Sequence, residues 1–244
     1  MIEEDFFEGH CSVAIFGGHG GGAVVAQSVR SLGSAGNAVN CIGFLNDTHA
    51  PGSLIGDLTV LGAFESWVDL NNETQFIAPL HKAGEATLRF ERIIQLGIPS
   101  HRWCNVIDPN SKVDNSVKVC HGTTIAPYVV VQPDVQIGSH VAIRSGVTIG
   151  HNSIISDHTF IGSNAVLCGY VTVGFGAHIA PGAAIRENTK IGRFSVVGLG
   201  AIVVDDVPDY SVVAGNPARI IHNLLNEKRS HQHISSYSSG IKTE

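Results

Sequence analysis

One stretch of the sequence, from Ile107 to Val203, repeats with a period of six residues. Every sixth residue in it is Ile, Val or Leu, at seventeen successive positions and without an insertion, although only 43% of the chain is hydrophobic. The residue four positions further on is Val, Ala, Ser or Thr throughout, as at Val147, Ser153 and Thr159. Such a period fits neither a helix nor a long amphipathic strand. It fits a short strand followed by a tight corner, with one large and one small inward side chain in each repeat.

Three repeats close one triangular coil, so stacked coils bring each strand beside its equivalent eighteen residues later. With strands about 4.8 Å apart along the axis, the aliphatic side chains form one continuous core. Asn164 and Asn188 near the corners suit backbone that turns sharply, as do the glycines that directly follow aliphatic positions. These glycines are Gly138, Gly150, Gly162, Gly174 and Gly192. The repeat therefore predicts a parallel β-helix of nearly six coils.

Length and charge narrow the classes of protein that the chain can belong to. Its 244 residues suffice for one large or two modest domains, and a formal charge of −6 does not favour nucleic acid or an anionic membrane as partner. No apolar run is long enough to span a bilayer, and the acidic start is unlike a secretory signal. Five cysteines without CxxC spacing indicate reduced thiols. We expect a cytoplasmic protein that binds neither nucleic acid nor membranes.

The first hundred residues follow the order strand, glycine-rich loop, helix, strand. The segments are 12–16, the loop Gly17, Gly18, His19, Gly20, Gly21 and Gly22, then 23–29, and 39–45 ending at Asn46 and Asp47. This order predicts a Rossmann-like domain whose loop amides and helix dipole face a phosphate, with base or ribose held at the end of the second strand. The glycines fall as GxxGxG rather than GxGxxG, and a plain strand-to-helix turn is the alternative. His19 contacts a phosphate or faces water.

We expect two domains, 1–104 and 105–228, and a disordered tail over 229–244. A further edge strand at 59–62, a strand at 75–78 and a helix at 87–96 complete the first domain. In that helix, Leu88, Ile93 and Leu96 are expected on one side. The apolar segment 212–221 is expected to cap the open end of the β-helix.

Histidines mark the candidate chemistry, because the filled interior of a β-helix leaves only corners and subunit seams for ligands. His121, His140, His158 and His178 are expected on one side of the prism, with His140 and His158 stacked. We interpret that pair as structural; a metal site would need a carboxylate or cysteine that the pattern does not supply, so no metal is expected.

His151 lies on a different side, and Gly169 takes its place one coil later. A histidine that accepts a proton beside an open glycine amide could serve acyl transfer, with the amide holding a developing oxyanion. The alternative is a solvent-facing or interface histidine without a catalytic task.

The segments His151 to Asp157 and Leu167 to Gly174, with the glycine loop and the ending 214–221, resemble a family of hexapeptide-repeat sugar acyltransferases. The family is typified by the sialic-acid O-acetyltransferases and the bacillosamine-pathway N-acetyltransferases. The resemblance implies a Rossmann-like domain that holds a nucleotide sugar, followed by a left-handed β-helix that forms a homotrimer and binds acetyl-CoA between subunits.

The resemblance also assigns roles to residues of this chain. His151 corresponds to the general base, Gly169 to the amide near the thioester oxygen, and Pro181 and Leu199 to contacts with pantetheine. The chain departs from the pattern at three positions: Asn152 replaces the acidic neighbour of the base, Phe160 a later histidine, and Gly21 a histidine of the loop. Because Asn152 cannot stabilise a protonated imidazole by charge, the base is weaker, borrows Asp157, or is His158.

The resemblance implies an acetyl-CoA-dependent N-acetyltransferase for the amino group of a nucleotide-linked sugar, with UDP as the expected nucleotide, in surface glycan biosynthesis. Two alternatives stay open. One is O-acetylation of a sugar hydroxyl. The other is a non-catalytic β-helix protein that binds nucleotide sugars, which the presence of Asn152 favours.

Overall fold

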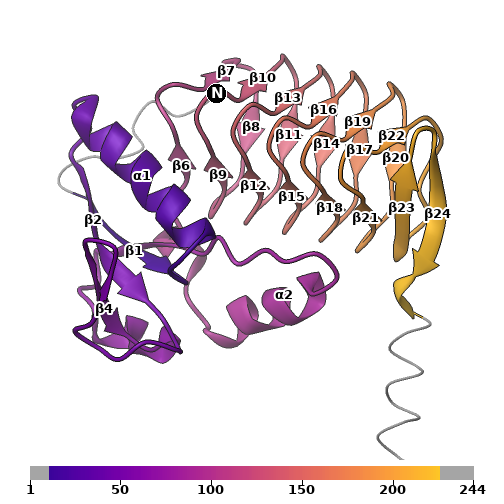
Figure 1. The fold of residues 1–244 in the computed structure, drawn as a ribbon. Coiled ribbons are helices and arrows are strands. Elements are labelled where there is room, and N and C mark those ends of the chain that lie inside the picture. The colour runs from indigo at the N-terminus through magenta and orange to yellow at the C-terminus, as the bar shows by residue number, and fades with distance from the viewer. Residues whose placement is uncertain (1–10, 226–244) are drawn as a thin grey trace, which may run out of the picture.

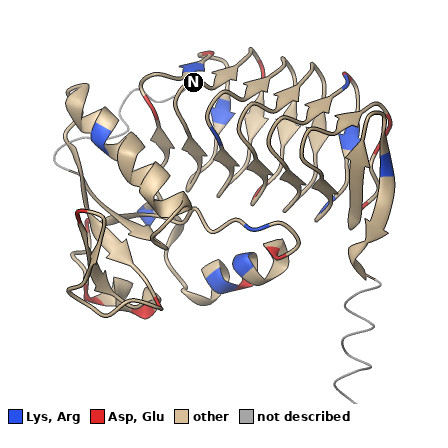
Figure 2. Cartoon of the chain, viewed as in Figure 1, with Lys and Arg blue, Asp and Glu red and all other residues tan. Residues whose placement is uncertain are grey.

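The computed structural model describes residues 11–225 and shows an N-terminal α/β domain followed by a left-handed parallel β-helix (Figure 1). The tail expected over 229–244 lies outside the described residues. None of the helices in the described part of the chain is long and apolar enough to cross a membrane. Lys, Arg, Asp and Glu residues are sparse along the coils of the β-helix (Figure 2).

The N-terminal domain is built on a five-stranded sheet with the order β3-β4-β2-β1-β5. Its elements are β1 (Cys11–Phe16), α1 (Gly21–Ser34), β2 (Val39–Leu45), β3 (Leu54–Ile55), β4 (Leu58–Gly62) and β5 (Gln75–Ile77). Neighbouring strands are parallel except β3 and β4, which form an antiparallel pair. Because β1 lies between β2 and β5, the strand order reverses at β1, and the loops that follow β1 and β5 leave the carboxyl edge of the sheet side by side.

The rest of the domain comprises the 3₁₀ turns η1 (Phe64–Asp69) and η2 (Ser100–Arg102) and the helix α2 (Ala86–Gln95). Of these, α2 lies alongside the β-helix (Figure 1), whereas η1 packs against the sheet through Phe64 and Phe16. Ile93 and Leu96 are buried, but Leu88 is 62% exposed, so the expected apolar side is wrong at Leu88. Five residues along a helix turn the side chain by roughly 140°, which places Leu88 away from Ile93 and toward solvent.

The β-helix contains seventeen two-residue strands between Val106 and Val203, all within the described residues. They are β6 (Val106–Ile107), β7 (Lys112–Val113), β8 (Lys118–Val119), β9 (Thr124–Ile125), β10 (Val130–Val131), β11 (Gln136–Ile137), β12 (Ala142–Ile143), β13 (Thr148–Ile149), β14 (Ile154–Ile155), β15 (Phe160–Ile161), β16 (Val166–Leu167), β17 (Thr172–Val173), β18 (His178–Ile179), β19 (Ala184–Ile185), β20 (Lys190–Ile191), β21 (Val196–Val197) and β22 (Ile202–Val203). Each ends on an aliphatic residue of the six-residue period. The predicted repeat and its register are confirmed.

Three parallel sheets form the sides of the prism, and we name each by its first strand. The β6 sheet holds β6, β9, β12, β15, β18 and β21; the β7 sheet holds β7, β10, β13, β16, β19 and β22; the β8 sheet holds β8, β11, β14, β17 and β20. Paired residues are eighteen apart, as at Ile143 and Ile161. The hairpin of β23 (Ser211–Gly215) and β24 (Ala218–Asn223) extends the β6 sheet at the far end, where a cap was expected.

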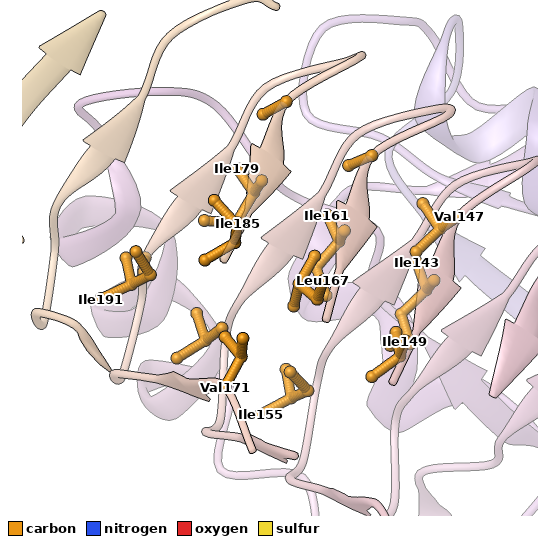
Figure 3. Packing of buried hydrophobic residues seen from close by; sticks show 14 of the residues in the cluster. Ile143, Val147, Ile149, Ile155, Ile161, Leu167, Val171, Ile179, Ile185 and Ile191 are labelled. Atoms are coloured by element: carbon orange, nitrogen blue, oxygen red, sulfur yellow. The ribbon is translucent and has the colours of Figure 1, made fainter. Parts of the chain in front are cut away.

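Inward aliphatic side chains fill the prism (Figure 3). Ile143, Ile161 and Ile179 stack along one side and are completely buried. The small residues of the repeat, such as Ser153 and Thr159, are also fully buried. Because the interior is closed, any ligand must bind at a corner or on a face.

The backbone conformation at the corners accounts for Asn164 and Asn188, but not for the glycines that follow the aliphatic residues. From Gly122 to Gly200, one residue in every six has a positive φ, including Asn164 and Asn188 as expected. The glycines after the aliphatic residues do not share this conformation, so the expectation that they serve the turn is wrong. A Cβ at Gly150 would lie 2.4 Å from the carbonyl carbon of Cys168, in the next coil. These glycines therefore permit the close stacking of backbone on backbone.

Candidate active site

His151 lies at the corner between the β7 and β8 sheets, exposed to solvent. Its backbone N–H donates to the side-chain oxygen of Gln132 at 3.0 Å, and its ring meets Tyr170 edge to face at 5.1 Å. Nδ1 lies 3.0 Å from Oδ1 of Asn152. Since an amide oxygen only accepts, this contact favours the tautomer with the proton on Nδ1 and leaves Nε2 with a free lone pair. The geometry is that of an oriented base.

Gly169 follows one coil later on the same corner, directly beside the imidazole. A Cβ on Gly169 would lie 2.8 Å from Cε1 and 2.9 Å from Nε2 of His151, closer than atoms ordinarily approach. Any larger residue at this position would therefore push the His151 ring aside. The Gly169 N–H donates no hydrogen bond within residues 11–225, so it is available to an outside acceptor.

Backbone N–H groups at the position equivalent to Gly169 in other repeats donate to side-chain oxygens. The N–H of His151 binds a side-chain oxygen of Gln132, and on another corner the N–H of Ser139 binds Oδ1 of Asp157 at 2.8 Å. These amides point outward and take acceptors that are not part of the coil ladder. A carbonyl oxygen that becomes negatively charged could take the same place at Gly169.

Pro181 and Leu199 lie elsewhere, at the corner between the β6 and β7 sheets. Pro181 is exposed, and Leu199 has 76% of its surface exposed. One protomer therefore does not bring these residues to His151 and Gly169, which stand at the next corner of the prism.

The glycine loop leads from β1 into α1 at the carboxyl edge of the sheet. Gly17 has a φ of 108° and Gly20 a φ of 72°, which favour glycine at both positions. A Cβ on Gly18 would come within 2.9 Å of the Asn46 side-chain nitrogen, whereas His19 and Gly20 are open to solvent. The exposed tip of the loop and the amino end of α1 thus face the same space.

Asn46 and Asp47 are both engaged within the protein. The Asn46 amide donates to the carbonyl of Gly17 at 3.1 Å, and its Oδ1 accepts the N–H groups of Thr48 and His49. It ties the end of β2 to the glycine loop. Oδ1 of Asp47 accepts the N–H of Phe64, and Oδ2 pairs with Arg92 at 2.9 Å. Asp47 thus ties the end of β2 to the first residue of η1 and to α2.

His49 is a candidate that the sequence analysis did not single out. Its ring lies 5.5 Å from that of His19, at the mouth of the glycine loop. No motif marks His49 in the sequence; its position depends on the turn that Asn46 holds together.

A group of histidines joins the N-terminal domain to the β-helix. His140 and His158 stack with ring centroids 5.0 Å apart, as expected, while His81 enters from the segment after β5 and packs 5.8 Å from Phe160. Burial lowers the pKa of His81 and His140 to about 3, and lowers the pKa of His158 and His178 to about 4. These rings are therefore neutral at pH 7 and hold the seam by packing.

Among residues 11–225, no group of His, Cys, Asp and Glu is arranged to hold a metal ion. His158 lies at the corner between the β8 and β6 sheets, against Phe90 of α2 at 4.9 Å, and not at the corner of His151. If His158 were the base in place of His151, the substrates would have to bind at this other, more enclosed corner.

Comparison with known proteins supports the repeat and the fold. The family model for the bacterial transferase hexapeptide (six repeats) matches residues 116–151. Residues 116–151 are therefore similar to the hexapeptide repeat of bacterial transferases. No curated protein matches the sequence.

Solved structures resemble nearly the whole chain. The acetyltransferase domain of PglB from Neisseria gonorrhoeae, in complex with acetyl coenzyme A, is 28% identical, with a TM-score of 0.75 over 87% of this chain and 100% of that one. A histidine-to-asparagine mutant of perosamine N-acetyltransferase from Caulobacter crescentus, in complex with CoA and GDP-perosamine, is 25% identical, with a TM-score of 0.75 over 87% of this chain and 97% of that one. WeeI from Acinetobacter baumannii, 21% identical with a TM-score of 0.74 over 86% and 100%, shares the fold.

Proposed function

We propose that the chain is an acetyl-CoA-dependent N-acetyltransferase that acts on the amino group of a nucleotide-linked sugar. The observation that carries the proposal is the His151 imidazole lying over Gly169, whose N–H is unused within the described residues. Solved structures of similar fold, one bound to acetyl-CoA and one to CoA and GDP-perosamine, support the donor and the substrate class. Acetyl-CoA is the acyl donor and no metal takes part.

In the proposed reaction, the sugar amine attacks the thioester carbonyl of acetyl-CoA. Nε2 of His151 accepts the proton that the nitrogen loses, while the Gly169 N–H donates to the oxyanion of the tetrahedral intermediate. Collapse of the intermediate breaks the carbon–sulfur bond. The thiolate of CoA leaves and takes the proton from His151, which restores the neutral base. Asn152 keeps Nε2 unprotonated at the start of the cycle through its contact with Nδ1.

The donor site in this proposal is completed by a second copy of the chain, in a homotrimer. Pro181 and Leu199 stand on a different corner from His151, so a pantetheine arm lying along them reaches the imidazole of a neighbour rather than of its own protomer. The exposed apolar residues Val130 and Val166 on the β7 sheet, between these two corners, support an interface there.

The nucleotide is proposed to lie on the glycine loop, with its phosphates toward Gly17, Gly18 and Gly20 and with His19 at the rim. Asn46 and Asp47 then act by shaping this loop and the end of β2, since their side chains already have partners. UDP is the proposed nucleotide, and GDP is the alternative that the Caulobacter structure raises. The proposed setting is surface glycan assembly in the cytoplasm, a compartment in which thiols such as the five free cysteines stay reduced.

The test is release of the CoA thiol from acetyl-CoA. Purified protein is incubated with UDP- and GDP-linked amino sugars and with the matching hydroxy sugars, and free thiol is measured. Release with an amino sugar only supports N-acetylation. Release with the hydroxy analogue indicates O-acetylation. Tight nucleotide-sugar binding without release indicates the non-catalytic alternative and refutes the proposed enzyme.

A further inference from the structure

Arg144 is a cation from the β-helix that lies against the glycine loop of the N-terminal domain. It directly follows β12, and a Cβ on Gly21, the first residue of α1, would lie 3.0 Å from its Nη2 atom. The guanidinium also lies over the ring of Phe160, 5.5 Å from its centroid. It is partly exposed, and burial lowers its pKa. A single side chain thus connects the two domains at the candidate nucleotide site.

The guanidinium of Arg144 has no anionic partner in the protein. Within residues 11–225 it forms no ion pair and donates no hydrogen bond. Its histidine neighbour His81 is neutral at pH 7. A half-buried cation without a partner is costly, because the lost hydration is not replaced. The protein itself therefore leaves a positive charge unbalanced at this point.

The surroundings add to this positive charge. In the described chain, the first turn of α1 contains no acidic residue, so the positive end of its dipole is unopposed. The carboxylate of Asp47, at the end of β2, is already paired with Arg92. Arg144 and the amino end of α1 would repel each other unless an anion lay between them.

Arg144 also lies near the point where the strand order of the sheet reverses. A Cβ on Gly21 would come within 3.0 Å of the Pro79 carbonyl oxygen, in the segment after β5, as well as of Arg144. The segment after β5 and the Arg144 guanidinium therefore both pack against the first residue of α1. In sheets of this kind, ligands bind outside the carboxyl ends of the strands where the order reverses.

We infer that Arg144 selects the diphosphate of the nucleotide sugar, pairing with phosphate oxygens that lie on the glycine loop and the amino end of α1. The inference rests on the proposed function and adds a specificity-determining residue supplied by the β-helix. The planar guanidinium can donate two parallel hydrogen bonds to one phosphate, which a lysine ammonium cannot reproduce. Binding of the diphosphate would also fix the N-terminal domain against the β-helix.

The experiment measures binding of UDP, GDP, uridine and guanosine by calorimetry to the wild type and to three variants. Arg144→Gln removes the charge, Arg144→Lys keeps it without the fork, and Arg186→Gln is the matched control. Arg186 also follows an aliphatic residue of the repeat, but it is exposed on another corner. Thermal unfolding of each variant checks that the fold is retained.

We expect Arg144→Gln to weaken the preferred diphosphate by about 10- to 100-fold and its nucleoside by less than about twofold. Arg144→Lys should fall between Arg144→Gln and the wild type, and Arg186→Gln should bind as the wild type does. The inference is overturned if Arg144→Gln and the wild type bind the diphosphate with equal affinity. It is also overturned if Arg144→Gln loses affinity for the nucleoside and for the diphosphate by the same factor. Both outcomes leave the proposed function intact. If the wild type binds none of the four probes, the nucleotide site of the proposed function fails and the inference fails with it.

Discussion

Replacement of Gly169 by alanine adds one methyl group beneath the candidate base. That Cβ would lie 2.8 Å from Cε1 and 2.9 Å from Nε2 of His151, whereas ordinary contacts lie at 3.4–4 Å. The imidazole must therefore retreat by on the order of 1 Å, since atomic overlap of this size is not tolerated. A reacting group misplaced by ~1 Å costs about 100-fold in rate. We expect Gly169→Ala to lower kcat/KM for acetyl transfer by about 100-fold.

The variant should remain folded, because φ of Gly169 is not positive and both residues lie at an exposed corner. Its backbone N–H is also retained, so the loss of rate would act through the displaced ring. A double-mutant cycle with His151→Ala tests this point. When the imidazole is absent, the added methyl group has nothing to displace, and Gly169→Ala should change the residual rate by less than about threefold.

The assay is thiol release from acetyl-CoA under saturating and subsaturating amino-sugar nucleotide, with circular dichroism and thermal unfolding as controls. Wild-type rates in a folded Gly169→Ala protein would refute the placement of the imidazole as base. A full 100-fold loss in both backgrounds would show that the methyl group acts on the donor site instead of on His151.

Four further outcomes follow from the structure. His151→Ala should lower the transfer rate by about 10²- to 10⁴-fold without changing the thermal midpoint or acetyl-CoA binding, as measured by thiol release and calorimetry. Asn152→Asp should extend the acidic limb of the pH–rate profile to higher pH, because a carboxylate stabilises the protonated ring and delays formation of the free base; an unchanged profile would exclude contact between the two side chains in solution. Burial lowers the pKa of His81 to about 3 and of His158 to about 4, so the unfolded chain binds more protons below pH 6.5 and stability should fall as pH drops from 6.5 toward 4. The free energy of unfolding, measured with urea, should fall by about 1.4 kcal/mol per pH unit for each histidine that stays neutral in the folded protein. A free energy of unfolding that does not change over this pH range would show that these rings are hydrated. Ile161→Ala should cost about 2–5 kcal/mol in the free energy of unfolding, since Ile161 is completely buried between coils.

The architecture of the β-helix was accessible from the sequence because its period is strict and local. Each strand is two residues long, and each ends on an aliphatic residue that the period identifies. The same reasoning placed His140 on His158 and His151 beside Gly169, since residues eighteen apart must stack when three repeats form a coil.

The glycines show where local reasoning failed. Gly150 and Gly162 were expected to allow the backbone to turn sharply. They are instead required because a Cβ at either position would clash with the backbone of the next coil. In the same way Leu88 was assigned to an apolar side, whereas α2 packs through Phe90 on the β-helix and leaves Leu88 in solvent. Such outcomes depend on which surface an element meets, and no window of sequence around the residue contains that information.

By itself the sequence determined the coil, its register and the pairing of His151 with Gly169, because a repeat of six residues allows only one way to stack the rungs. The tertiary structure alone decided that Arg144 meets the glycine loop and that His81 joins the histidines of the β-helix. The physical reason is the distance along the chain between the partners. Contacts between two domains are set by how their surfaces fit, which the spacing of residues within either domain does not encode.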